Sequence, residues 1–231
     1  MNQTRITILC GGLGVGLMLL LHWMVFYWVP TERNQGVVHR ILFIHVPAAW
    51  VGFMAFGIAA VCSALYLWKR DDRLDVAASA AAEGGMVFTT IVLLTGPLWG
   101  RVAWGTWWLW DIKLILTVLL WFIYFGYFFV RTSTNNPSRG KRAAAVVGIV
   151  GVLNIPLIYF SVIWFRSIHP GPVVFTGSGP GMDGKMLVTL IVGFGAATLI
   201  FWALFLLRYG VGRLEREVPS RDHSPELGTE W

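Results

Sequence analysis

The sequence predicts an all-α polytopic membrane protein with six transmembrane helices, and three observations support this prediction. Of the 231 residues, 56% are hydrophobic and only 13% are charged, and the mean hydropathy is +0.66. Apolar runs long enough to span a bilayer recur along the chain. The connections between these runs are short and hold most of the charged residues. A chain of this composition has too little polar surface for a soluble domain.

The six expected spans form one transmembrane domain, residues 1–210, followed by a charged cytoplasmic tail, 211–231. Their approximate bounds are 6–29, 41–68, 78–98, 112–130, 143–165 and 186–207. The first span is interrupted only by His22 and is longer than the apolar core of a signal peptide, so we expect a retained helix. Gly12 and Gly16 predict that this helix packs closely against another.

Two prolines and two polar residues modify the expected spans. Pro47 is predicted to lie in the first turn of the second span, where its missing N–H costs nothing, and His45 is then at the helix mouth. Asn154 and Pro156 lie near mid-membrane, where a proline kinks a helix and frees a carbonyl. We interpret this pair as a packed kink. Glu83 is close enough to the start of the third span to reach water.

The basic residues predict the orientation of the chain in the membrane. Twelve fall in the N-terminus, the 69–75 turn, the 131–142 loop and the tail: Arg5, Lys69, Arg70, Arg73, Arg131, Arg139, Lys141, Arg142, Arg208, Arg213, Arg216 and Arg221. Six fall on the other side: Arg33, Arg40, Arg101, Lys113, Arg166 and Lys185. By the positive-inside rule both termini are cytoplasmic. The connections after the first, third and fifth spans are then expected to lie together outside.

A cluster of five tryptophans lies in the connection between the third and fourth spans, residues 99–111. Its sequence is WGRVAWGTWWLWD, with indoles at Trp99, Trp104, Trp107, Trp108 and Trp110. An indole has a large flat apolar body and one N–H donor, so it suits a place that is apolar on one side and wet on the other. An interfacial aromatic belt is the simpler explanation, but belts scatter aromatic residues over many helix ends. We therefore expect an aromatic shelf for a flat ligand.

Three of the five histidines fall in the same outer connections. His39 and His45 precede the second span or open it, and His169 follows the fifth. Two imidazoles on opposite faces of a flat macrocycle make six-coordinate haem, so the histidines and the shelf together predict haem binding. Spacing alone does not decide between His39 and His45. Cys10 and Cys62 lie inside apolar runs without a CxxCH motif, which argues against covalent haem attachment and thiol–disulfide catalysis.

The tryptophan-rich stretch also resembles a known family. WGTWWLWD at 104–111, preceded by GPLWGRVAWG and flanked by FIHVPAAW and SIHP, resembles the signature of the WWD family of haem-handling membrane proteins. The length and the six spans are similar to the CcmC family, haem exporter protein C of the cytochrome c maturation system. The resemblance extends from the first span to the sixth. It implies a haem-binding protein of the bacterial inner membrane that forms no covalent bond itself and is not an enzyme.

The resemblance further implies a site and a set of partners. His45 and His169 would be the axial ligands of a transiently held, non-covalent haem b at the periplasmic surface. The segment 104–111 would be the haem platform, contributed by Trp104, Trp107, Trp108, Trp110 and Asp111. The haem would pass to the chaperone CcmE with the help of the small membrane protein CcmD, and the ABC transporter subunits CcmA and CcmB would act on the loaded complex. The net charge of +6 follows the topology, so the expected surroundings are a lipid bilayer and not a nucleic acid.

Charged residues near the shelf have separate expected roles. Four cations are nearest in sequence to the aromatic connection and the His169 loop, and we expect them to neutralise the haem propionates: Arg101, Lys113, Arg166 and Lys185. Lys113 stands where the family pattern leads us to expect arginine, so it keeps the charge but lacks the planar fork. Asp111 is expected to hold the loop by accepting backbone N–H bonds or by capping the fourth helix.

Two other classes of protein remain open at this point. A cytochrome c synthase of the same tryptophan-rich type would attach haem to apocytochrome, but such proteins are much longer. A quinone-binding or redox subunit, or a transporter, would carry ionisable residues deep in its spans. Apart from Glu83, His22 and Asn154 this chain has almost none, so a hydrophilic path across the bilayer is not evident.

Overall fold

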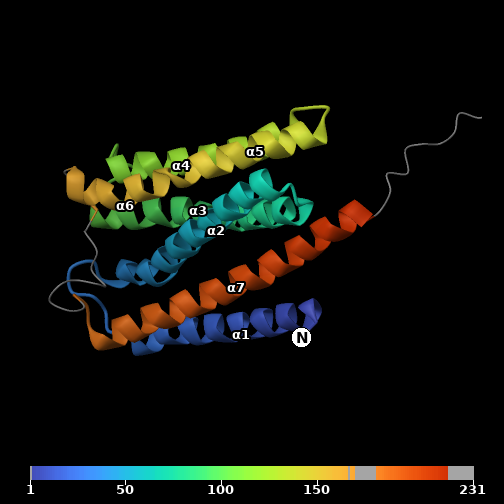
Figure 1. Cartoon of the computed structure of the whole chain (residues 1–231). Coiled ribbons are helices and arrows are strands. Elements are labelled where there is room, and N and C mark those ends of the chain that lie inside the picture. The colour runs from blue at the N-terminus through green and yellow to red at the C-terminus, as the bar shows by residue number, and fades with distance from the viewer. Residues whose placement is uncertain (1, 166, 170–180, 218–231) are drawn as a thin grey trace, which may run out of the picture.

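The computed structural model describes residues 2–165, 167–169 and 181–217, and its regular structure there is helical (Figure 1). The elements are α1 (Gln3–Trp23), a π-helical turn (Met24–Trp28), a 3₁₀ turn (Val37–Ile41), α2 (Leu42–Lys69), α3 (Asp72–Ala103), α4 (Ile112–Thr132), α5 (Pro137–Val152), α6 (Asn154–Trp164) and α7 (Gly184–Glu217). Within these described residues, six helical segments are long and apolar enough to cross a membrane. The expected number of spans is therefore confirmed, with α5 and α6 together forming the fifth.

The helices run antiparallel and pack as neighbouring pairs. Figure 1 shows α1 beside α7, α2 beside α3, and α4 beside α5 and α6, and the packing contacts agree. The chain reversals gather at two ends. We call one the tryptophan end, which holds residues 29–41, 104–111, 167–169 and 181–183. The other is the charged end, which holds the N-terminus of α1, the turns 70–71 and 133–136 and the C-terminal turns of α7.

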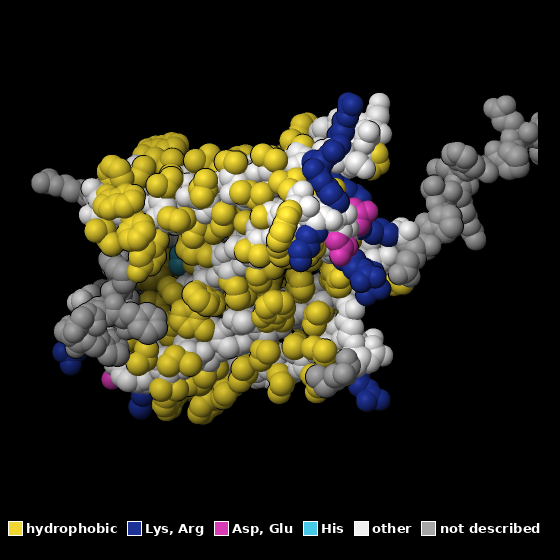
Figure 2. Space-filling view, in the orientation of Figure 1, with side chains coloured by type: hydrophobic (Ala, Val, Ile, Leu, Met, Phe, Trp, Pro, Cys, Tyr) yellow, Lys and Arg dark blue, Asp and Glu magenta, His cyan; other side chains and the backbone are white. Residues whose placement is uncertain are grey.

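The surface has the division expected of a membrane protein. Figure 2 shows hydrophobic side chains over most of the length of the helices, while lysine, arginine, aspartate and glutamate gather at the charged end. Large exposed apolar side chains occur on the outward faces of α1 and α4, including Leu13, Leu19, Phe122 and Phe129. Contact of such an apolar surface with lipid tails is favourable, whereas its exposure to water would be unfavourable.

The centre of the bundle is held by one tyrosine. Tyr124 of α4 is fully buried, and its ring stacks on Phe56 of α2 with a centroid separation of 3.7 Å. Its hydroxyl donates to the Gly148 carbonyl of α5 at 3.0 Å. Phe56 in turn lies against Gly85 of α3, where a Cβ atom would come within 2.4 Å of the ring. One aromatic stack thus ties four helices together, because small residues let the backbones approach.

Two expectations about individual helices are wrong. Pro47 is not in the first turn of α2, because the 3₁₀ turn and the α-helix begin earlier, at Val37 and Leu42. The proline lies inside the helix, and α7 packs there through Gly193, where a Cβ atom would lie 3.0 Å from the Phe43 carbonyl oxygen. The expected contacts of α1 through Gly12 and Gly16 are also wrong.

Gly14 is the glycine of α1 that makes the close contact. A Cβ atom at Gly14 would lie 3.0 Å from Ile200 of α7, while Gly12 and Gly16 have no such neighbour within 4 Å. The reason is the direction of the helix face, since residues 12 and 16 share one face and residue 14 lies on the opposite one. The face that packs on α7 is therefore the one that carries Gly14.

The fifth span is interrupted, as the sequence predicts. α5 ends at Val152 and α6 begins at Asn154, with Pro156 in the first turn of α6, where its missing N–H is tolerated. The buried Asn154 side chain donates to the Leu116 carbonyl of α4 at 2.7 Å. This contact supports the interpretation as a packed kink.

Two boundaries differ from those expected. α3 continues to Ala103, so the first five residues of the tryptophan-rich stretch 99–111 are helical and the loop itself begins at Trp104. α7 continues to Glu217, so the start of the expected tail, 211–217, is also helical. Residues 218–231 of that tail lie outside the described residues.

Candidate functional site

His45 lies in the first turn of α2, half-buried against α3. Its Nδ1 is 2.8 Å from the hydroxyl of Thr95 on α3, and the ring lies against Gly96. Because Nδ1 is engaged with the hydroxyl, Nε2 is the ring nitrogen left for a ligand. The second and third spans therefore position this histidine jointly, at the level where the bundle meets the tryptophan end.

Trp99 separates His45 from His39. Its ring makes edge contacts with both imidazoles, at centroid distances of 5.8 Å to His45 and 5.9 Å to His39. The Trp99 Nε1–H donates to the Gln35 side-chain oxygen at 2.6 Å, and His39 Nδ1 lies 3.3 Å from the same oxygen. Trp99 is thus a helical residue that braces the two histidines rather than part of the exposed loop.

His169 lies on the segment that follows α6, beside the tryptophan loop. Its ring contacts Trp104 at a centroid distance of 5.1 Å and an interplanar angle of 60°. Its Nδ1 is buried and has no hydrogen-bond partner among the residues that the structure describes, where a carboxylate oxygen of Asp111 lies 3.8 Å away. Burial lowers the pKa of His169 to about 4, the positive charge of Lys113 adds to this, and Asp111 opposes it. At neutral pH the imidazole is uncharged, so it can offer a nitrogen lone pair and forms no salt bridge with Asp111.

Asp111 joins the two loops that carry the shelf and His169. Its carboxylate caps α4 by accepting the Lys113 N–H at 3.0 Å, which confirms the expected cap. It also accepts the Ser167 hydroxyl and the Ile168 N–H, each at 3.1 Å. The sequence offers no local signal for these last two bonds, since the partners are more than fifty residues apart. Asp111 therefore fixes the approach of His169 to the loop.

The tryptophan loop presents indoles to its surroundings. Trp107 and Trp110 are 57% and 82% exposed, and Trp108 meets Trp110 edge-on at 6.0 Å. Trp104 lies against Gly100, where a Cβ atom would be 3.0 Å from the ring, so a glycine is needed at this close approach. Gly105 has a φ of +77° and turns the chain directly after α3. Large indoles left open in this way form a surface for an apolar partner.

The four expected cations differ in their surroundings. Lys113 interacts electrostatically with both His45 and His169. The Arg101 guanidinium donates to the Gly105 carbonyl and thereby braces the loop. Lys185 lies over the Trp28 ring, 5.6 Å from its centroid. Arg166 lies outside the described residues.

The two candidate ligands lie against tryptophans that are five residues apart: His45 contacts Trp99, and His169 contacts Trp104. His39 contacts the same Trp99 ring as His45, and its Nδ1 faces the Gln35 side-chain oxygen. Figure 2 shows a histidine side chain within a recess between the helices. Two imidazoles, exposed indoles and a nearby cation can hold a flat, apolar, anionic ligand that contains a metal.

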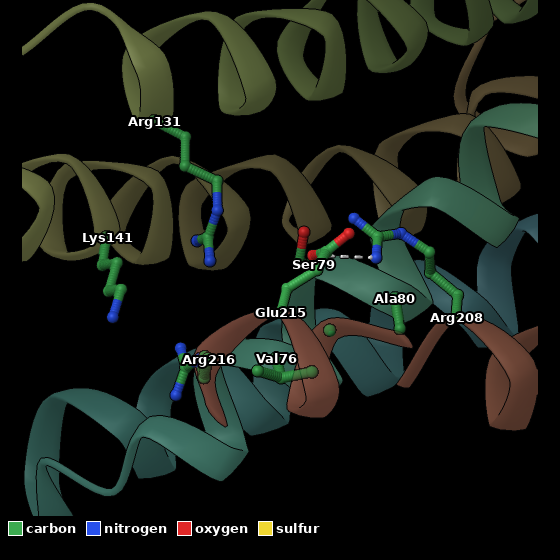
Figure 3. Close-up of a pocket in the computed structure, with 9 residues that line it drawn as sticks. Val76, Ser79, Ala80, Arg131, Lys141, Arg208, Glu215 and Arg216 are labelled. Atoms are coloured by element: carbon green, nitrogen blue, oxygen red, sulfur yellow. Dashed lines mark hydrogen bonds and ion pairs between the residues drawn. The ribbon is translucent and has the colours of Figure 1, made fainter. Parts of the chain in front are cut away.

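A second cluster of charged side chains lies at the charged end, where the sequence predicts separate cytoplasmic segments: the 69–75 turn, the 131–142 loop and the tail. Figure 3 shows Arg131, Lys141, Arg208 and Arg216 around a pocket of about 250 Å³ between α3, α4, α5 and α7. The fully buried Asp75 pairs with two of these arginines: its carboxylate accepts from both terminal nitrogens of Arg131 at 2.6 Å and from one of Arg216 at 2.8 Å.

Each cation of this pocket pairs with a carboxylate. In the part of the chain that the structure describes, their acidic partners are Asp72, Asp75, Glu83 and Glu215. Glu83 is partly exposed, which agrees with the expectation that it reaches water, and it also accepts the Arg208 Nε–H at 2.7 Å. Four positive and four negative groups leave the cluster without a net charge, which favours a role in holding the helix ends together.

Comparisons with known proteins assign the chain to a family. The family model "Heme exporter protein C", CcmC, matches residues 2–224. The heme exporter protein C of Bradyrhizobium diazoefficiens is 40% identical over 191 residues, which cover 83% of this chain and 73% of that protein. The proteins of the same name from Haemophilus influenzae and Rhodobacter capsulatus are each 33% identical, over 89% and 79% of this chain and 81% and 76% of their own lengths. The chain therefore belongs to the CcmC family of heme exporter proteins of cytochrome c biogenesis.

Proposed function

We propose that the protein holds haem at the tryptophan end, with His45 and His169 as axial ligands, and delivers it to the chaperone CcmE. The observation that supports this most directly is that two imidazoles from separate connections lie against Trp99 and Trp104, beside an exposed row of indoles. Haem iron supplies the two coordination positions that such imidazoles would fill. The porphyrin would be contacted by Trp104, Trp107, Trp108 and Trp110. His39 would keep its hydrogen bond to the Gln35 side chain and would not bind iron.

The surroundings of both imidazoles suit iron ligation. Metal-binding histidines usually donate their second ring N–H to a hydroxyl, carbonyl or carboxylate that orients the ring. Nδ1 of His45 already meets the Thr95 hydroxyl, and the unpartnered Nδ1 of His169 faces the Asp111 carboxylate. In both residues Nε2 is the nitrogen that would bind iron.

Limited burial would make the haem transferable. The exposure of Trp107 and Trp110 leaves one edge of the shelf open, so a bound porphyrin would stay within reach of a partner. We propose CcmE as the acceptor, CcmD as the supporting membrane subunit, and CcmA and CcmB as the transporter subunits that act on the loaded complex. In this proposal the tryptophan end faces the periplasm of the bacterial inner membrane, and the protein catalyses no bond formation.

The test is the visible spectrum of the purified protein in detergent, loaded with haem and compared with three single variants. His45→Ala and His169→Ala are each expected to lose most of the Soret absorbance, while His39→Ala keeps it. A colourless wild type at full haem excess would overturn the proposal. Loss of the band in His39→Ala alone would move the ligand assignment to His39 and leave haem binding intact.

Lys113 is our proposed partner for a haem propionate. Its charge acts on both candidate ligands, whereas the side chain of Lys185 is occupied by Trp28. A hydrogen bond to a charged group contributes about 1.5–3 kcal/mol, so Lys113→Gln is expected to weaken haem binding about tenfold or more. Lys185→Gln is the control with near wild-type affinity. Equal effects of the two changes in a haem titration would refute the assignment.

A further inference from the structure

Thr95 on α3 has a hydroxyl with two short contacts. The oxygen lies 2.7 Å from the Ile91 carbonyl one turn earlier in the same helix and 2.8 Å from His45 Nδ1 on α2. A hydroxyl has a single proton to donate and can accept in addition. Both contacts can therefore be hydrogen bonds only when the hydroxyl donates its proton to one partner and accepts a proton from the other.

The Ile91 carbonyl must be the receiver, because a carbonyl oxygen only accepts. The hydroxyl then accepts a proton from His45, so Nδ1 carries hydrogen and Nε2 carries the free lone pair. Bonding of a helical threonine to the carbonyl four residues earlier is a common arrangement. The helix geometry of α3 thus selects the tautomer of a histidine on another helix.

Thr90, on the same helix, shows the same arrangement with an unambiguous donor. Its hydroxyl lies 2.7 Å from the Met86 carbonyl and accepts the Trp121 Nε1–H at 2.9 Å. An indole N–H can only donate. Thr90 therefore serves as an internal example of the proton arrangement deduced at Thr95, and as a matched control residue.

We propose that Thr95 is a positioning residue that holds His45 in the tautomer and orientation needed for iron binding through Nε2. The inference rests on the proposed haem function and deepens it. Among the described residues, His169 Nδ1 has no hydrogen-bond partner equivalent to Thr95, and the segment that carries His169 is held by Asp111 through Ser167 and Ile168. His45 is accordingly held in its binding orientation before haem binds. The ring of His169 would gain an orienting hydrogen bond only when haem binds.

The experiment measures the rate of haem transfer from the purified, haem-loaded protein to excess apomyoglobin. Thr95→Val keeps the shape but removes the acceptor, and loss of such a supporting bond costs about 10–100-fold in metal affinity. We expect faster haem loss of that order and a smaller low-spin, six-coordinate fraction. Thr95→Ser should restore wild-type values, and Thr90→Val should match the wild type. Each variant is checked for an unchanged elution profile and helix content.

Combining Thr95→Val with a substitution of either candidate ligand distinguishes the loss of His45 positioning from general destabilisation of the protein. In His169→Ala, where His45 alone would hold the iron, Thr95→Val should lower the residual Soret absorbance further. In His45→Ala, Thr95→Val should leave the residual absorbance unchanged, because the residue that Thr95 supports is absent. An effect in the His45→Ala background, failure of Thr95→Ser to rescue, or identical behaviour of Thr95→Val and Thr90→Val would each overturn the inference.

The proposed function and this inference fail in different ways. If His45→Ala retains haem as well as the wild type, His45 is not a ligand and the proposed site is wrong. If His45→Ala loses haem while Thr95→Val holds it normally, the haem site stands and only the role of Thr95 is refuted.

Discussion

The Asp111 carboxylate has two distinct roles. Substitution can distinguish an effect on haem retention from an effect on the stability of the protein. It caps α4 through the Lys113 N–H, and it holds the segment before His169 through Ser167 and Ile168. Asp111→Ala is expected to cost about 1 kcal/mol for the lost cap. It is also expected to accelerate haem loss, because the segment that carries His169 loses its anchor.

Asn136 is the matched control for this prediction. It caps α5 at the charged end by accepting the Arg139 N–H at 3.2 Å. Asn136→Ala should therefore lower the free energy of unfolding by a similar amount in a detergent titration while leaving haem dissociation unchanged. If both variants lose haem equally fast, the effect of Asp111 is one of stability alone.

At the scale of single residues, the sequence identified the chemistry but not every contact. Residue type and position predicted a site formed by outer histidines and the loop tryptophans, the family resemblance chose His45 over His39, and Asp111 was predicted as a cap from its place before an apolar run. The bonds from Asp111 to residues 167–168 and from His45 to Thr95 were not. They depend on how separate helices register with one another, which no local pattern encodes.

At the scale of helices, Asp75 is expected to hold the charged end of the bundle together. It is 2% exposed and pairs with Arg131 of α4 and Arg216 of α7. Removing one partner of a buried ion pair leaves an uncompensated charge and costs about 3–5 kcal/mol. Asp75→Asn should therefore lower the free energy of unfolding by an amount of this order.

Asp72 provides the control in the same turn of α3. It pairs with Lys141 and Arg216, but its side chain is 56% exposed. Exposed pairs contribute about 0–1 kcal/mol, so Asp72→Asn should be nearly neutral in the same titration. A loss for Asp75→Asn no larger than that for Asp72→Asn would show that the pocket cations do not stabilise the bundle.

Helix boundaries were harder to predict than helix identities. The third span was expected to end at residue 98, before the tryptophans, but α3 continues to Ala103 in spite of Pro97. Proline is tolerated within the helix, and the end coincides with the positive φ of Gly105. Reading Gly105 as the helix stop would have placed Trp99 correctly on α3. The packing face of α1 was missed because each of its glycines was equally suitable on sequence grounds.

For the whole molecule, the expected grouping of connections agrees with the described structure. The apolar runs predict six helices, and the structure has six segments of that kind among its described residues. Because successive spans alternate in direction, the connections after the first, third and fifth lie at one end. This is why residues as distant as His45, Trp107 and His169 could be expected at the same end of the bundle. The cluster around Asp75 was not predicted, because its charges also fit an ordinary solvated turn.

The orientation of the two ends in the membrane is the remaining whole-molecule prediction. The excess of basic residues at the charged end predicts that this end is cytoplasmic and the tryptophan end periplasmic. In a chain with Cys10 and Cys62 replaced by alanine, single cysteines report each side: Asn34→Cys and Gly184→Cys at the tryptophan end, and Asn135→Cys in the α4–α5 turn. A membrane-impermeant maleimide added to spheroplasts should label the first two at once.

Asn135→Cys should react only after the membrane is permeabilised, because the reagent cannot reach the cytoplasmic side. The opposite pattern would place the tryptophan end in the cytoplasm and contradict delivery of haem outside. Labelling of Asn34→Cys and Gly184→Cys from different sides would be more serious. Asn34 lies in the connection that leads to His45 in the first turn of α2, and Gly184 begins α7 after the connection that carries His169. Such a result would therefore leave no common surface on which two imidazoles could meet one iron.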